Sequence, residues 1–175
     1  HYPALPSSRF PEFLARLAAY RGRKMTRIAV ELSLLTFVRS SEMRFARWDE
    51  FDFDNACWRI PARREEIEGV RYSYRGMKMK EEHIVPLSTQ ALALLDELKK
   101  LSGDNPRLFP GDHDPNKVMS ENTVNNALRT MGYDTQTEVC GHGFRTMARG
   151  ALGESGLWSD DAIERQLSHS ERNNV

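Results

Sequence analysis

The chain has 175 residues, 39% hydrophobic and 29% charged, which is enough to bury one substantial core in a single globular domain. No apolar run approaches the roughly 20 residues that cross a bilayer, and no N-terminal segment resembles a signal peptide. Lysine plus arginine equals aspartate plus glutamate at 25 each, so net charge gives no argument for a nucleic-acid partner. Two cysteines, Cys57 and Cys140, exclude a disulfide framework and favour a cytoplasmic location.

The N-terminal half is predicted to be helical. Residues 1–6 have the composition of a linker, and the chain does not begin with methionine, so we expect one domain over 1–175 taken from a longer protein. Apolar residues at helical spacing predict helices around 14–18 and 28–38, with breaks near Gly22 and at 39–41. A third helix is expected from Glu42 through Trp48, capped by Ser40 or Ser41.

Basic residues are concentrated in this half of the chain. Seven stand between positions 21 and 47 against two acidic ones, an excess that fits either a phosphate backbone or an ordinary solvated helix face. The seven are Arg21, Arg23, Lys24, Arg27, Arg39, Arg44 and Arg47. Arg39 is expected at the mouth of the third helix, where backbone amides also favour an anion.

Strands are predicted in the middle of the chain and helices after it. Alternating residues predict a hairpin of 51–53 with 57–60, and a second antiparallel pair of 71–74 with 83–87 whose turn carries lysines. Ser88 is expected to cap a helix over 91–98. Further helices are predicted at 120–131, 144–152 and 160–167, with a break at 153–156. The expected fold class is therefore α+β, mostly helical, with a small antiparallel sheet.

A histidine and an arginine near the C-terminus carry the strongest chemical signal. His142 and Arg145 are three positions apart at a predicted helix start, which places them on one face. A guanidinium can bind two phosphate oxygens while an imidazole donates to a third or moves a proton. Together with Arg39 upstream and His169 downstream, they suggest a site for a phosphodiester.

The order and spacing of these motifs resemble the tyrosine recombinases, and within them the prophage and genomic-island integrases. The resemblance covers nearly the whole chain, and four boxes in order are far more specific than any one of them. They are Arg39 with Glu42, followed by Trp48 and the strand 51–53; Lys78, in a turn ahead of Val85, Pro86 and Leu87; His142 with Arg145; and His169 after Leu167 and Ser168. Lys78 fits the pattern better than Lys80, although both stay open.

The resemblance implies a catalytic domain that rejoins DNA without a cofactor or metal. A tyrosine attacks a phosphate, leaving a 3′-phosphotyrosyl bond and a free 5′-hydroxyl. Arg39 and Arg145 would neutralise the charge on the phosphate, which a metal ion would otherwise do. Lys78 would protonate the leaving oxygen, His142 would act as base or phosphate donor, His169 would donate a hydrogen bond, and Glu42 would orient a neighbour. The implied partner is duplex DNA, bound by a homotetramer.

Two features depart from the family pattern. The family places its tyrosine about nine or ten residues after the last histidine, but the chain ends six residues after His169. We therefore assign no nucleophile, expect it beyond Val175, and expect these 175 residues alone to be inactive and monomeric. The second departure is the stretch 63–75, longer than the usual link, for which an extended hairpin and a disordered loop both stay open.

Two other classes of function stay open. The first is a DNA-binding module without catalysis, in which the arginines and histidines only grip phosphate. The second is a zinc site from Cys140, His142, His169 and His113, which lacks a compact ligand pair at the usual spacing.

Overall fold

The computed structural model describes residues 1–76 and 81–155. Within them the helices are α1 (Phe10–Ala18), α2 (Lys24–Thr36), α3 (Ser40–Arg44), α4 (Thr89–Ser102), α5 (Thr123–Thr130) and α6 (Gly143–Ser155). The strands are β1 (Phe51–Asp52), β2 (Cys57–Ile60) and β3 (His83–Pro86), and short 3₁₀ turns cover Ser7–Arg9 and Trp48–Glu50. None of the helices in this part of the chain combines the length and apolarity of a membrane span.

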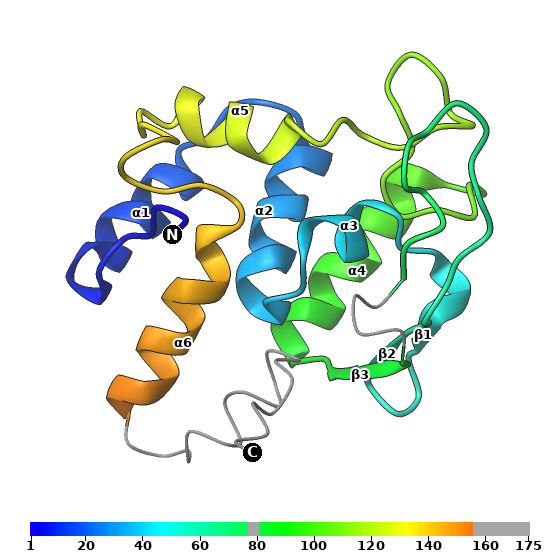
Figure 1. Ribbon diagram of the computed structural model, residues 1–175, viewed down its shortest axis with the longest axis horizontal. Helices are drawn as coiled ribbons and strands as arrows, with labels where there is room; N and C mark the ends of the chain where they lie inside the picture. The colour runs from blue at the N-terminus through cyan, green and yellow to red at the C-terminus, as the bar shows by residue number, and fades with distance from the viewer. Residues whose placement is uncertain (77–80, 156–175) are drawn as a thin grey trace, which may run out of the picture.

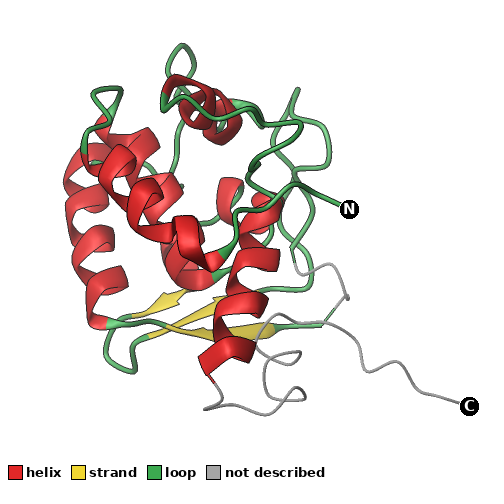
Figure 2. Ribbon diagram, turned by 90° about the vertical axis from the view of Figure 1, so that its left-hand side faces the viewer, coloured by secondary structure: helices red, strands yellow, loops and turns green. Residues whose placement is uncertain are grey.

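Helix α2 lies at the centre of the molecule and contacts α4, α5 and α6 (Figure 1). Ile28 and Leu32 pack in a core with α4 and the sheet, whereas Val30 packs with α1, α5 and α6. One central helix therefore joins two apolar clusters. The sheet lies along one edge of the helical body (Figure 2).

The sheet has the order β1-β2-β3 and is antiparallel throughout. Its inner residues Trp58, Ile60 and Val85 are almost completely buried. The predicted hairpin of 51–53 with 57–60 is confirmed in its pairing of Phe51 with Trp58. The predicted pairing of 71–74 with 83–87 is wrong, because β3 pairs with β2, with His83 opposite Ile60.

Several predicted helix boundaries differ from the observed ones. The third helix is shorter than expected and begins at Ser40, with Arg39 in the capping position and no side-chain capping bond, so the predicted serine cap is wrong. Helix α6 continues through the predicted break at Gly153 as far as Ser155. The cap by Ser88 is confirmed, since its hydroxyl accepts from the amide of Ala91 at 3.1 Å. The helix predicted at 160–167 lies outside the described residues.

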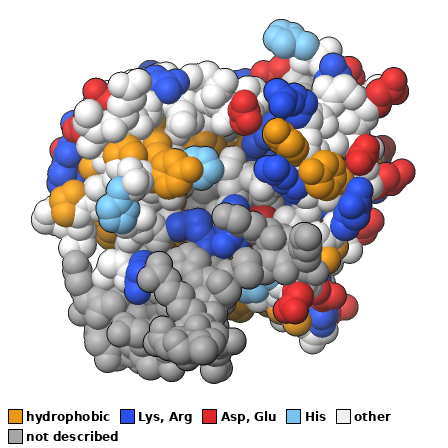
Figure 3. All heavy atoms as spheres, viewed as in Figure 1, with side chains coloured by type: hydrophobic (Ala, Val, Ile, Leu, Met, Phe, Trp, Pro, Cys, Tyr) orange, Lys and Arg blue, Asp and Glu red, His pale blue; other side chains and the backbone are white. Residues whose placement is uncertain are grey.

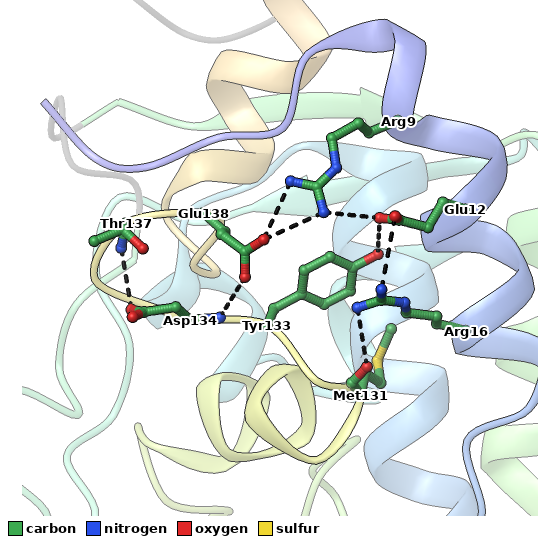
Figure 4. A network of polar contacts seen from close by, with 8 residues as sticks. All are labelled: Arg9, Glu12, Arg16, Met131, Tyr133, Asp134, Thr137 and Glu138. Carbon is green, nitrogen blue, oxygen red and sulfur yellow. Dashed lines mark hydrogen bonds and ion pairs between the residues drawn. The ribbon is translucent and has the colours of Figure 1, made fainter.

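A polar network fastens α1 to the turn after α5 (Figure 4). The hydroxyl of Tyr133 donates to Glu12 at 2.9 Å, and Arg9 bridges Glu12 and Glu138 at 3.0 and 3.2 Å. Burial, together with the hydrogen bond to Glu12, raises the pKa of Tyr133 to about 12. This phenol therefore stays protonated and serves as a structural donor.

A buried arginine organises the region between the sheet and α3. The guanidinium of Arg64 binds both carboxylate oxygens of Glu50, at 2.9 and 2.8 Å, and Glu50 also accepts from the indole of Trp58 at 3.1 Å. The remaining guanidinium N–H groups donate to the carbonyls of Ser41, Glu42 and Arg75. The stretch 63–75 is thus neither an extended hairpin nor a loose loop but a folded segment anchored from within.

Removal of this arginine should destabilise the protein strongly. Arg64→Leu leaves the Glu50 carboxylate buried without its partner, which typically costs roughly 3–5 kcal/mol. Urea denaturation followed by circular dichroism would measure the loss. The control is Arg63→Leu, because Arg63 is exposed in an ion pair with Glu66 and should change stability by less than about 0.5 kcal/mol. Equal effects of the two variants would contradict the assigned role of Arg64.

Candidate active site

Arg39 occupies the mouth of α3 and is held there by an acid from the same helix. Its Nη1 donates to Glu42 Oε1 at 3.1 Å, and the side chain of Glu42 is only 2% exposed. A buried carboxylate needs a charged or hydrogen-bonding partner, so this contact fixes the direction of the Arg39 guanidinium. Glu42 is fixed in turn, because its backbone carbonyl accepts from Arg64 at 3.0 Å.

Arg145 reaches the same place from the other end of the chain. It lies in the first turn of α6, and its Nη1 donates to the backbone carbonyl of Phe37. Phe37 ends α2 in the left-handed conformation with φ 55°, two residues before Arg39. Arg145 therefore binds the turn that leads into Arg39, although the two arginines stand 106 positions apart in the sequence.

His83 is a site residue that the sequence reasoning missed. It begins β3, is half-buried, and feels the charges of both Arg145 and Arg39. Burial first, then these two guanidiniums, lowers its pKa. In the sequence it stood only as the first residue of a predicted strand. Its place directly after the lysine turn was the signal that could have identified it.

His142 lies immediately before α6, whereas Arg145 lies within it. The two residues therefore do not share one face of a helix as predicted. Its ring stacks on Tyr2, with centroids 4.6 Å apart and planes inclined by 20°. The next residue must be a glycine, because a side chain at Gly143 would collide with the carbonyl of Pro3. That carbonyl also accepts from the amide of Cys140 at 3.2 Å. The N-terminal segment therefore lies directly against His142.

The two remaining predicted site residues, Lys78 and His169, lie outside the described residues, as does Lys80. Figure 3 shows lysine and arginine side chains at the centre of this face, beside atoms that are not described. Across the ranges 1–76 and 81–155, no group of three or more His, Cys, Asp or Glu side chains is placed to hold a metal ion. Cys57 and Cys140 are buried free thiols.

This arrangement can bind one anion at two points. A guanidinium offers several N–H donors in a rigid plane, and two such groups near His83 suit a phosphate better than a single carboxylate. A neutral imidazole at His83 adds a donor or acceptor without adding positive charge.

The lowered pKa of His83 predicts a stability change with pH. Below the ordinary histidine pKa of about 6.5, His83 is protonated in the unfolded chain but still neutral in the folded protein. The free energy of unfolding should therefore fall as the pH drops from about 6.5 to the lowered pKa of folded His83. Urea denaturation at several pH values should show a smaller decrease in the free energy of unfolding for His83→Gln than for the unaltered protein. His113→Gln, which removes an exposed imidazole, is the control. Identical pH profiles for His83→Gln and the unaltered protein would contradict the assignment.

The chain is similar to known proteins over its whole length. Residues 6–175 match the phage integrase family. The chain is 87% identical over 175 residues to the integrase of Enterobacteria phage P4, covering 100% of this chain and 40% of that protein. It therefore spans less than half of that relative.

Solved structures share the fold at low sequence identity. The Tn1549 transposon integrase in complex with transposon right end DNA superposes with a TM-score of 0.74 and 15% identity, covering 98% of this chain and 59% of that one. The lambda integrase tetramer bound to a Holliday junction superposes with a TM-score of 0.67 and 16% identity, covering 100% of this chain and 49% of that one. These matches confirm the predicted α+β, mostly helical recombinase fold.

Proposed function

Because the chain belongs to the phage integrase family, we propose that it acts in site-specific DNA recombination, as the catalytic domain that cleaves and rejoins DNA strands during integration or excision. The observation that carries the proposal is that Arg145 binds the carbonyl of Phe37, two residues before Arg39, and that both guanidiniums act electrostatically on His83. A phosphodiester attacked by an oxygen nucleophile gains negative charge on its non-bridging oxygens. Two fixed guanidiniums stabilise that charge most where it is greatest, in the transition state.

The reaction is a transesterification through a 3′-phosphotyrosine. The tyrosine oxygen bonds to phosphorus as the bond from phosphorus to the 5′-oxygen breaks, and the departing oxygen takes a proton. Reversal of these steps on an exchanged strand rejoins the DNA. Because each step replaces one phosphate ester by another, no external energy source is needed.

The other roles in this proposal rest on the family resemblance. Lys78 protonates the departing 5′-oxygen, His142 acts as base or phosphate donor, and His169 donates to the phosphate. Glu42 orients Arg39, which agrees with their contact at 3.1 Å. None of the five tyrosines in the chain stands where the family places its nucleophile.

Duplex DNA is the proposed partner, bound by four copies of the complete protein during strand exchange. The solved lambda integrase tetramer on a Holliday junction and the DNA complex of the Tn1549 integrase support this proposal by similarity of fold. The basic side chains at the centre of the site face agree with an anionic ligand (Figure 3).

Loss of either arginine should remove strand cleavage. In the full-length protein, Arg39→Ala or Arg145→Ala should reduce covalent attachment to a nicked attachment-site duplex by about 10²–10³-fold, as loss of one transition-state donor does. The adduct is measured on denaturing gels. The control Arg59→Ala removes an exposed arginine whose partner is Glu82, and should retain attachment.

The outcomes distinguish the recombinase from a DNA-binding module without catalysis. Normal attachment by Arg39→Ala would contradict the proposed site. If the unaltered protein binds DNA tightly but forms no adduct under any condition, a DNA-binding module without catalysis becomes the better account.

A further inference from the structure

The segment 63–75, between β2 and β3, is a rigid platform rather than a flexible link. The Arg64 amide donates to the carbonyl of Tyr74 at 2.8 Å, and the hydroxyl of buried Ser73 accepts from the amide of Ile67 at 2.7 Å. Ile67 packs in a small apolar cluster with Phe45 and Val118. These contacts fix the backbone on both sides of the turn at 71–74.

Two arginines of this turn are arranged around one tyrosine. Tyr72 is 46% exposed and has a left-handed backbone with φ 63°. The guanidinium of Arg75 lies 4.0 Å from the centre of its ring, and that of Arg71 lies 5.3 Å away. Arg71 also donates to the Tyr72 hydroxyl at 3.4 Å. Stacking on a ring limits the motion of a guanidinium but leaves its N–H edge open to a further acceptor.

These two cations differ from most arginines of the described ranges in having no acidic partner. Arg9, Arg23, Arg27, Arg47 and Arg59 each form an ion pair, but among the described residues no carboxylate pairs with Arg71 or Arg75. The acids of the segment lie in its first half, where Glu66 pairs with Arg63. The turn at 71–75 is therefore a small, ordered and uncompensated basic surface.

This surface lies beside the candidate active site. Nη1 of Arg64 donates both to the carbonyl of Arg75, at 3.1 Å, and to that of Ser41, at 3.3 Å, so these two backbone segments are neighbours. Ser41 is two residues beyond Arg39. The segment runs back past α3 at the right of Figure 1, and Figure 3 shows lysine and arginine side chains over this region on the same face as the site.

We propose that Arg71 and Arg75, pre-arranged on Tyr72, bind backbone phosphates of the DNA duplex next to the phosphate that is cleaved. The proposal rests on the proposed function for its ligand and adds a second contact to it. Both guanidiniums present planar donor edges that fit phosphate oxygens. The contact is to the backbone, so it fixes register and affinity without reading sequence.

The test compares DNA affinity over a series of salt concentrations. In the full-length protein, the double variant Arg71→Gln/Arg75→Gln should bind a synthetic duplex of mixed sequence more weakly. It should also reduce the slope of log affinity against log salt by about 1 to 2, one counterion for each lost phosphate contact. The matched control Lys100→Gln removes an exposed cation paired with Asp96 on α4 and should keep the slope.

Each outcome decides the proposal. An unchanged affinity and slope in the double variant would overturn it, as would an equal change in Lys100→Gln, which would indicate only a general charge effect. An unaltered protein that does not bind duplex DNA would overturn it too.

Failure of the proposed function would look different. At saturating DNA, Arg39→Ala should bind the duplex without forming the covalent adduct, which tests the proposed reaction separately from the turn. If the unaltered protein bound DNA but formed no adduct, the recombinase reaction would be contradicted. The role of the turn would still be tested by comparing the salt dependence of DNA affinity in the double variant and the unaltered protein.

Discussion

The buried ion pair of Arg64 with Glu50 is the contact on which the site depends. Two charges taken out of water are tolerated only when their hydrogen-bonding groups are satisfied, and here five N–H contacts from one guanidinium meet Glu50 and three carbonyls. Those carbonyls belong to α3 and to the segment 63–75. One side chain therefore sets the position of the helix that carries Arg39 relative to the sheet.

The second constraint is the packing of α6 against α2. The N-terminal turn of α6 brings Arg145 to the end of α2, two residues before Arg39, so helix packing places two cations in the region of His83. Like charges in one region repel each other, and the free energy of helix packing and of the Glu42 contact opposes that repulsion. An incoming phosphate removes the repulsion, which makes the site selective for an anion.

Local patterns in the sequence predicted most helices, the hairpin at Asp54 to Ala56 and the cap at Ser88, because these depend on neighbouring residues. The predicted partner of β3, the stretch 71–74, was wrong, and β3 pairs with β2 instead. Strand pairing depends on which side chains reach the core, and a local pattern does not determine this. Arg64 resembled any other residue of a charged stretch, and nothing local marked its burial. Arg39 and Arg145 could be named from the family resemblance, whereas the proximity of His83 to both needed the tertiary fold.

Phe37 has a strained backbone that its surroundings hold in place. A left-handed residue that is not glycine persists only where neighbouring contacts impose that conformation, and the hydrogen bond from Arg145 to the Phe37 carbonyl is one such contact. A glycine would adopt the same angles with less strain but with greater conformational entropy. The ordering of the arginine pair is thus completed when the domain folds, and a ligand that arrives later does not have to supply it.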